Sequence, residues 1–581
     1  MDWTESYNRS VLASTAEKMI DQLIKEIYLM RLTIHTDNNL TVNELGMLYR
    51  WPLYIGINTF LERLVRSIYD IDRGYENIYK GGEYKNVYFK NITDACYSYY
   101  NDNSLNINLL NKLSKLLSNN YELEKKTINY HNDESVIKKN KYTISSGIRF
   151  LRRYLVKFYL TIIRVYKKNS IAYEESKSMN LIFPIKSRII ELPYNILPLD
   201  TKTRGKIKEC SKKVFINNSS FFSDKIEKSV TGELAEYFVD WVDKILPYSV
   251  IEGLQSRLKF YENLLNNWHV VQVHSSVGYA YNDNYKCFAI MAKRKGAKIV
   301  GQDHGAHPPP KYLPSGQDQK KFYKGFSCLY FNDYYLTWGD PRQHPCDAWD
   351  GVDRIHSVKI FNNGSVYLKK LKKWKKTQIN KETLTVLYPS GPLRNFMANL
   401  QEITPEKNSF HRLNVLTMLK NLLSKYSKLR ILYKSFMGSD LSNDPIKEML
   451  SNYVSQGRIQ FTNILPINLM PKVDIVLFDM ISTGFAEAIE IGVPTLVYRK
   501  NIDYELVSDK SRKINDKLHN CGVFFFDMHK GIQSFEKILS DLNGFQEESR
   551  SALRCFQGLS AYPVSKKEYL KNLNKKITIN N

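Results

Sequence analysis

The residues best suited to chemistry stand in segment 297–305, AKIVGQDHG. A short β-branched run ends there in Gln302, Asp303, His304 and Gly305, which predicts a strand that ends at a loop. An aspartate at a strand end suits a nucleophile or a general base, and a histidine suits a general base or a donor to phosphate. Polar loop residues without a catalytic role fit this short pattern equally well, so the strand-end position is the argument for function.

Three further polar groups follow strand-like runs between residues 383 and 498. Hydroxyl and guanidinium groups after a strand suit an anionic phosphate or carboxylate. The amides of the helix after Ser482 would hold a phosphate, and Glu487 in its first turn would reach a sugar or ribose hydroxyl. An ordinary helix capped by Ser482 or Thr483 is the competing interpretation. Because three such strand ends share one predicted sheet, a common ligand is favoured, with donor-binding candidates Ser390, Gly391, Arg394, Lys434, Ser482, Thr483 and Glu487.

The segments around residue 300 predict a parallel sheet. Residues 268–276, WHVVQVHSS, predict a strand, residues 283–296 a helix and residues 297–302 the next strand. In such sheets the ligand lies beyond the carboxyl ends of the strands. His274 and Gln302 lie at those ends, so we expect both on the acceptor side of a cleft.

The chain is long enough for two or three domains. Helical spacing dominates residues 1–200, which we predict to be a mainly helical N-terminal region. Residues 201–365 predict a first α/β domain with a parallel sheet. Residues 366–382 predict a basic linker, and residues 383–581 a second α/β domain that ends in helices. The predicted fold class is therefore α/β, with two such domains facing a cleft.

The net charge is +25, from 84 Lys and Arg against 59 Asp and Glu. Such a charge favours an anionic partner, although compositional drift in a chain rich in Lys, Asn, Ile and Tyr explains it as well. A predicted helix that starts at Ser145 and ends at Lys168 has basic residues near one face. That helix would lie on an anionic membrane or guide a lipid-linked acceptor, or would simply have a solvated basic face. The linker sequence LKKLKKWKKTQ leaves the same two interpretations open.

Several classes of function lack their usual signals. There is no run of about 18 apolar residues, and the N-terminus lacks a signal-peptide pattern. We therefore expect a cytoplasmic protein, either free or peripheral at the inner face of the cytoplasmic membrane. The seven cysteines form no CxxC pair. Phosphate loops, HExxH, GxSxG, DxD and nucleic-acid modules are absent, so we expect no metal, no cofactor and no nucleic acid.

Two segments together resemble a known group of enzymes. AKIVGQDHG with YFNDYYLTWG, and VDIVLFDMISTGFAEAIEIGVPTLVY downstream, look like the surface-carbohydrate transferases of the spirochaete O-antigen type. That group is similar in turn to bacterial Kdo transferases and CDP-glycerol glycerophosphotransferases. The resemblance covers residues 268–498. It implies a GT-B arrangement of two Rossmann-like domains with the active site between them. Residues 201–365 would then bind the acceptor and carry catalysis, and residues 383–581 would hold the nucleotide donor.

The resemblance carries over to single residues of the first motif. His304 and Gly305 match the His-Gly pair that follows the N-domain strand in the surface-carbohydrate and glycerophosphotransferase groups. Asp303 alternatively matches the acidic residue at the comparable strand end of retaining Kdo transferases. The resemblance therefore implies that catalysis belongs to Asp303 or His304.

In the second half, LYPSGPLR resembles the glycerophosphotransferase loop that ends in an arginine. Ser482 and Thr483 resemble the serine-rich donor loop of the same enzymes. Lys434 and Ser435 stand where Kdo and sialic acid transferases often have His-Pro, a departure that counts against a CMP-linked donor.

Together these features predict a metal-independent glycosyltransferase. It would transfer a sugar from a nucleotide-activated donor, with CMP-linked sugars among the candidates, to a lipid-linked or growing bacterial surface polysaccharide such as O-antigen or capsule. A glycerophosphotransferase-like enzyme that moves a polyol phosphate is the nearest alternative. A non-catalytic basic protein that binds membrane or nucleic acid is the alternative from another class, and it would bind polyanions in a salt-sensitive way.

Overall fold

The structure is a computed structural model of the 581-residue chain. It describes residues 6–29, 40–73, 75–80, 88–95, 103–118, 124–129, 170–174, 177–183, 187–192, 194, 198–222, 228–303, 305, 331–339, 358–374, 379, 382, 384–393, 405–436, 444–499 and 509–577. The predicted helix that starts at Ser145 and ends at Lys168 lies outside the described residues, as do His304 and Arg394.

The first of the two main sheets is parallel and has five strands in chain order. Its strands are β3 (Ser170–Tyr173), β4 (Val270–Ser275), β5 (Lys298–Gln302), β6 (Tyr334–Thr337) and β7 (Lys359–Asn362). The short helices α6 (Lys177–Ile182) and α10 (Gly278–Tyr281) precede α11 (Asp283–Arg294), which connects β4 to β5. Strands buried on both faces explain why the sequence here shows apolar runs rather than alternation.

The second main sheet is also parallel, with six strands in the order β10-β9-β8-β11-β12-β13. They are β8 (Thr385–Pro389), β9 (Arg430–Lys434), β10 (Ile459–Phe461), β11 (Ile475–Phe478), β12 (Thr495–Tyr498) and β13 (Phe524–Phe525). The chain runs outward from β8 to β10 and then crosses back to β11. The strand order therefore reverses between β8 and β11, which is the place where doubly wound sheets bind ligands.

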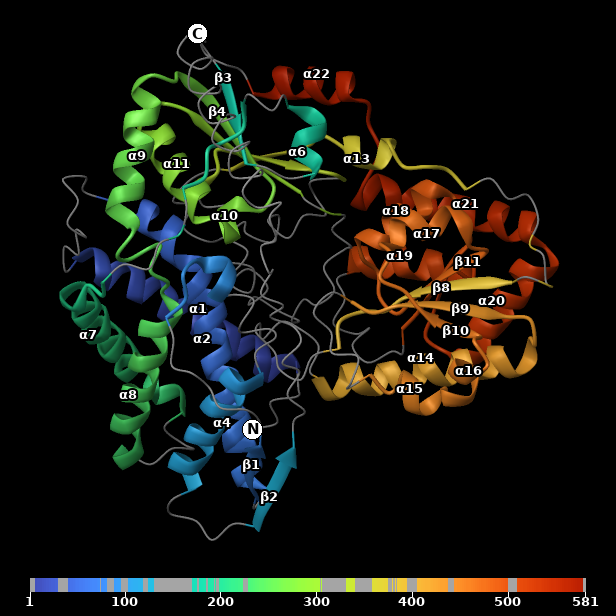
Figure 1. The fold of residues 1–581 in the computed structure, drawn as a ribbon, viewed down its shortest axis with the longest axis horizontal. Coiled ribbons are helices and arrows are strands. Elements are labelled where there is room, and N and C mark those ends of the chain that lie inside the picture. The colour runs from blue at the N-terminus through green and yellow to red at the C-terminus, as the bar shows by residue number, and fades with distance from the viewer. Residues whose placement is uncertain are drawn as a thin grey trace, which may run out of the picture.

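Helices surround the second sheet (Figure 1). The long ones are α14 (Pro405–Lys425), α18 (Thr483–Ile491), α19 (Asp509–Asn520), α20 (Met528–Ser540) and α21 (Leu542–Ser560). Shorter turns are α15 (Ile446–Met449), α16 (Ser451–Ser455), α17 (Pro466–Leu469) and a 3-10 helix at Met470–Lys472. One apolar core joins these helices to the sheet, so the described residues between 384 and 561 form one folded unit.

The N-terminal region is mainly helical, as predicted, and it shares one apolar core with the first sheet. Its helices are α1 (Ser6–Leu29), α2 (Val42–Asp72), α4 (Asn103–Ser118), α7 (Thr201–Asn218), α8 (Lys228–Ile245) and α9 (Leu254–Asn266), with a 3-10 turn at Ser219–Phe222. A separate pair of parallel strands, β1 (Tyr75–Lys80) and β2 (Glu124–Asn129), lies beside them.

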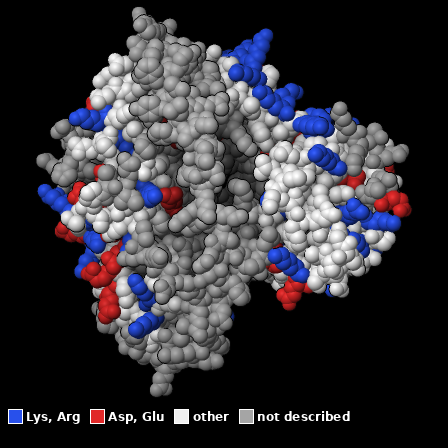
Figure 2. Space-filling model, in the orientation of Figure 1, with Lys and Arg blue, Asp and Glu red and all other residues white. Residues whose placement is uncertain are grey.

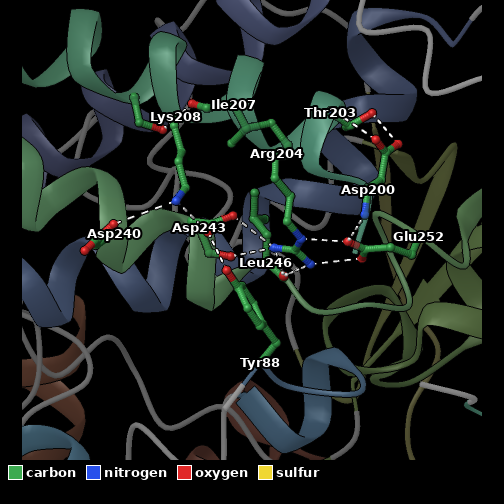
Figure 3. A network of polar contacts seen from close by, with 11 residues as sticks. Tyr88, Asp200, Thr203, Arg204, Ile207, Lys208, Asp240, Asp243, Leu246 and Glu252 are labelled. Carbon is green, nitrogen blue, oxygen red and sulfur yellow. Dashed lines mark hydrogen bonds and ion pairs between the residues drawn. The ribbon is translucent and has the colours of Figure 1, made fainter. Parts of the chain in front are cut away.

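A buried arginine fastens these helices together (Figure 3). Arg204 on α7 donates two hydrogen bonds to Glu252, at 2.6 and 2.9 Å, and a third to the Asp243 carbonyl at 2.8 Å. The Asp243 carboxylate also accepts a bond of 2.7 Å from the Tyr88 hydroxyl. A guanidinium tolerates burial when its donors are met by carboxylates in this way. The network therefore supports packing of the helical region.

Two elements belong to the first sheet domain although they lie outside the bounds predicted for it. Strand β3 lies inside the predicted helical region 1–200. The sequence did not predict it, because four residues are too few to show the period of a strand. Helix α22 (Lys566–Lys576) lies beyond the second sheet in sequence, but Tyr569 and Leu573 pack in a core cluster with Val300 and Leu336 of the first sheet. Within the predicted linker, the structure has the short helix α13 (Val366–Lys369).

The predicted fold class is confirmed: the chain has two Rossmann-like α/β domains in a GT-B-like arrangement and a mainly helical N-terminal region. None of the helices in the described part of the chain combines the length and the apolar character needed to cross a bilayer.

Candidate active site

One close contact between the two domains joins Gly305, after β5, to Thr483 at the start of α18. A Cβ atom at Gly305 would lie 2.3 Å from the Thr483 hydroxyl oxygen, closer than any real Cβ contact. Only a glycine allows the backbone of the first domain to approach this close. The contact brings the segment AKIVGQDHG against the ISTG loop of the second domain, as the sequence predicts.

Asp303 is buried at the carboxyl edge of the first sheet, with 1% of its surface exposed. Its backbone N–H donates to the Leu336 carbonyl at 3.0 Å, and its carboxylate accepts from the Trp338 N–H at 2.8 Å. The carboxylate therefore holds the chain where β6 ends.

Gln302 and His274, the predicted acceptor-side residues, are also buried. The Gln302 amide oxygen accepts a hydrogen bond of 2.6 Å from the hydroxyl of Tyr569 on α22. His274 is fully buried, with its Nε2 2.9 Å from the Gln272 amide oxygen and its ring against Phe183. Burial lowers the pKa of His274 to about 3, so the ring is neutral. In this conformation both side chains belong to the packing behind the edge rather than to its surface.

Glu174 is a buried acid at this edge that the sequence did not single out. It directly follows β3, and its carboxylate accepts from the Ser275 hydroxyl at 2.6 Å and from the Gly278 N–H at 2.7 Å. Burial raises the pKa of Glu174. An acid after the run SIAY was the available signal, but a four-residue strand at a sheet edge is too short to identify from its pattern.

At the carboxyl edge of the second sheet, two buried side chains hold the loop after β8. The Gly391 N–H donates to the Asp479 carboxylate at 2.8 Å, and the Gly391 carbonyl accepts from Arg412 at 2.7 Å. Arg412 is 2% exposed, and it also pairs with Asp444 at 2.9 Å and with Asp479 at 3.4 Å. A Cβ atom at Gly391 would lie 2.9 Å from Asp479, so this approach also requires glycine. Arg412 could not be identified from the sequence, because its partners lie far along the chain.

Ser390 and Lys434 lie side by side where β8 and β9 end. The Ser390 N–H donates to the Lys434 carbonyl at 2.9 Å, and the Ser390 hydroxyl accepts from Tyr433 at 3.2 Å. Ser390 is buried and Lys434 is half-buried. The structure thus brings together three donor-binding candidates, Ser390, Gly391 and Lys434, next to Asp479.

The N-terminus of α18 is open. Ser482 has extended backbone angles at the N-cap position, but its hydroxyl makes no capping hydrogen bond. The backbone N–H groups of Phe485 and Ala486 donate to the Ser482 carbonyl at 3.0 and 3.4 Å. An ordinary capped helix would use the serine hydroxyl here. The free end of the helix therefore suits an anion.

Glu487 lies in the second turn of α18, one turn later than predicted, because the helix begins at Thr483. Its carboxylate accepts a hydrogen bond of 2.7 Å from the hydroxyl of Tyr367 on α13. Burial, together with this negative charge, raises the pKa of Tyr367. Glu487 therefore connects the donor-side helix to the segment that joins the domains.

The described residues contain no group of three or more His, Cys, Asp or Glu side chains that could hold a metal ion.

Comparison with solved structures gives distant likenesses. The Staphylococcus aureus MnaA structure with UDP is 12% identical and covers 56% of this chain and 78% of its own, with a TM-score of 0.32. The Neisseria meningitidis UDP-GlcNAc 2-epimerase bound to UDP-GlcNAc is 12% identical, with 55% and 81% covered and a TM-score of 0.33. Apo UGT2 of Phytolacca americana is 12% identical, with 75% and 98% covered and a TM-score of 0.34. At such low TM-scores the fold assignment rests on the strand order above.

No curated protein matches the sequence. The family model described as LIC12162 family transferase matches residues 47–544. The match begins within α2 and spans both main sheets and the contact between them. The chain therefore belongs to the LIC12162 family of transferases.

Proposed function

We propose that this transferase moves a sugar from a nucleotide-activated donor to a lipid-linked or growing bacterial surface polysaccharide, such as O-antigen or capsule. The observation that carries the proposal is the contact of Gly305 with the open N-terminus of α18. This contact lies beside the strand-order reversal of the second sheet, where a nucleotide is expected.

The donor would lie against the second domain. Its phosphates would accept hydrogen bonds from the free amides of α18 and from the hydroxyls of Ser482 and Thr483. Lys434 would add a positive charge, and Arg394 would do so as predicted from the sequence. Fixed donors of this kind stabilise a departing nucleotide because the charge that develops on it meets dipoles already in place.

Glu487 would bind a hydroxyl of the donor ribose or sugar. Its hydrogen bond from Tyr367 already fixes the carboxylate in a half-buried position, so little freedom would be lost when a ligand binds.

Catalysis would belong to Asp303 or His304. The carboxylate of Asp303 is buried and bonded to the Trp338 backbone, which favours a positioning role for Asp303 and leaves His304 as the group that touches the substrate. A histidine suits this step because its pKa lies near physiological pH.

The resemblance of AKIVGQDHG and the ISTG loop to surface-carbohydrate transferases supports a polysaccharide acceptor. Of the similar groups, Kdo transferases would use a CMP-linked donor and glycerophosphotransferases a CDP-linked polyol. Lys434 and Ser435 in place of His-Pro favour a donor other than a CMP-sugar.

The test is a donor screen with matched variants. Thermal stabilisation would be measured with UDP-, GDP- and CDP-linked sugars, CMP-sugars and CDP-glycerol, and turnover would be measured with each compound that binds. We expect Ser482→Ala with Thr483→Ala to weaken donor binding by at least about 100-fold, since each of the two lost hydrogen bonds to a charged group costs about 1.5–3 kcal/mol. Thr417→Ala, on the exposed face of α14, is the control and should bind like the wild type.

Unchanged donor binding by the double variant would place the nucleotide elsewhere and refute the site. If CDP-glycerol were the only compound that stabilised the protein against heat, the proposed reaction would change from sugar transfer to polyol-phosphate transfer. His304→Ala should abolish turnover without weakening donor binding, and near-normal turnover of that variant would remove His304 from the mechanism.

A further inference from the structure

The chain connects its two sheet domains twice, and the two connections lie side by side. The Ser365 N–H donates to the Tyr562 carbonyl at 2.8 Å, and the Val564 N–H donates to the Ser365 carbonyl at 3.1 Å. Ser365 and Pro563 form a parallel β-bridge. The segments that enter α13 and α22 are therefore one structural unit at the hinge between the domains.

This hinge carries a dense group of exposed lysines. Figure 2 shows Lys and Arg gathered over α22 and over the segment from α13 onward. We name the hinge ridge by six of these residues, Lys369, Lys370, Lys372, Lys566, Lys567 and Lys571, all exposed. Within the described part of the chain none of the six makes an ion pair. Their charge is therefore available to a partner.

Folding alone explains why these side chains point outward but not why lysine is so frequent among them, with Glu568 as the one exposed acid of the described α22. Tyr569 and Leu573 of α22 are buried against the first sheet, which forces Lys567 and Lys571 to the opposite side. Lys567 and Lys571 are four residues apart on one helix, a spacing at which like charges repel. Neutral polar residues would be equally soluble and would avoid that repulsion. A partner with negative charge would turn the unfavourable arrangement into a favourable one.

The chemistry of the ridge fits lipid headgroups better than nucleic acid. All six residues are lysines, which act as point charges and lack the forked donors with which arginine recognises phosphates and bases. Trp374, two residues after Lys372, is half-buried and donates its indole N–H to the Val473 carbonyl at 2.9 Å, so it is not available to stack on a base. A surface of lysines without exposed aromatic rings suits the diffuse negative potential of an anionic bilayer.

The place of the ridge also suits a membrane contact. A bilayer bound at the connections between the domains would leave both sheets free to open and close around a donor. It would also keep the cleft near a lipid-linked acceptor.

We propose that the hinge ridge is a docking surface for an anionic membrane. The reason for such docking rests on the proposed function, because a lipid-linked acceptor is found at a bilayer. The binding itself does not depend on turnover, so the two proposals can fail separately.

The experiment is sedimentation of the full chain with vesicles. One set of vesicles contains phosphatidylglycerol and phosphatidylcholine in equal parts, and the other contains phosphatidylcholine alone. The wild type should bind the anionic vesicles and release them at high salt. Changing Lys566, Lys567 and Lys571 to Gln should weaken binding about 100-fold, since each lysine near the surface contributes about 1 kcal/mol. Adding Lys369→Gln, Lys370→Gln and Lys372→Gln should abolish it.

The matched control changes three exposed lysines away from the hinge, Lys202, Lys420 and Lys428, to Gln. It removes the same charge, so equal weakening by the control would show a net-charge effect and overturn the proposal. Anionic-vesicle binding by the sixfold variant at wild-type strength, or competition by duplex RNA at lower concentration than the vesicles, would also overturn it. Donor compounds should stabilise the ridge variants against heat as much as they stabilise the wild type. If no donor compound stabilised either the wild type or the variants, that result would count against the proposed function and not against the ridge.

Discussion

The polar side chains at the carboxyl edges of the two sheets differ in burial and in hydrogen bonding. At the first sheet, the side chains of Gln302, Asp303 and His274 are buried and bonded within the first domain or to α22. At the second sheet, a buried layer of Asp479 and Arg412 lies beneath the loop after β8. The hydroxyls at the start of α18 and the half-buried Lys434 stay open above that layer.

Polar residues at a strand end can therefore serve either to hold the chain or to contact a ligand. The first edge uses them to fix the path of its own chain, which rigidifies the segment that reaches Gly305. The second edge uses one set of buried charges as support and leaves another set for a ligand. We propose that the donor binds at the second edge, whereas the buried side chains of the first edge fix the end of β5.

The largest effect should come from removing the support of the second edge. Arg412→Met would leave the carboxylates of Asp444 and Asp479 buried without their cation, which we expect to lower the free energy of unfolding by about 3–5 kcal/mol. Urea unfolding measures this change. Lys212→Met, which breaks an exposed pair with Glu236, is the control and should change stability far less. Equal losses in both variants would contradict the supporting role of Arg412.

The buried His274 at the first edge should make the free energy of unfolding depend on pH. The folded pKa of His274 is about 3, below the value of 6.5 expected in the unfolded chain. Between these values the unfolded state binds more protons, so stability is complete above pH 6.5 and falls as the pH falls. This residue alone should remove about 2 kcal/mol between pH 6.5 and pH 5.

Unfolding of the wild type and of His274→Gln across this pH range measures that contribution as a difference. The raised pKa of Glu174 acts in the opposite direction, and it cancels because both proteins contain it. Parallel curves for the two proteins would mean that His274 is protonated in the fold.

The contact between the edges should respond to a single methyl group. Gly305→Ala would place Cβ 2.3 Å from the Thr483 hydroxyl, so either the Thr483 side chain would have to turn away or the two domains would have to move apart. We expect turnover to fall about 10-fold, equivalent to about 1.4 kcal/mol, with little change in stability. In a Thr483→Ala background, where that hydroxyl is gone, the same substitution should cost much less. An equal loss in both backgrounds would show that the contact does not limit turnover.

The smallest effect concerns the hinge. Tyr367→Phe removes the hydrogen bond to the Glu487 carboxylate while keeping the ring. We expect a loss of about 1 kcal/mol in the free energy of unfolding and a weaker affinity for the donor. Calorimetric titration with the donor found in the screen measures the second change. Glu487→Gln should weaken donor binding at least as much, and the reverse order would separate Glu487 from the donor.

Much of this fold could be predicted from the sequence because its strands are buried and its helices are long. The strand at residues 297–302 and the helix at residues 283–294 show their own periods, as do the strands and helices of the second domain. Strand β3 and the return of α22 to the first domain could not be predicted. The first is too short to have a period, and the second depends on contacts between residues that are far apart in the chain.

The sequence by itself determined which residues stand at strand ends, since a strand end is a local property of apolar and polar order. It also determined that AKIVGQDHG and the ISTG loop belong to two different sheets. The tertiary structure decided how those residues are used. The partners of Asp303, Gln302 and Glu487 are Trp338, Tyr569 and Tyr367, each more than thirty residues away along the chain. Burial and long-range hydrogen bonds depend on packing, and so only the folded chain separates a side chain that supports the site from one that is open to a ligand.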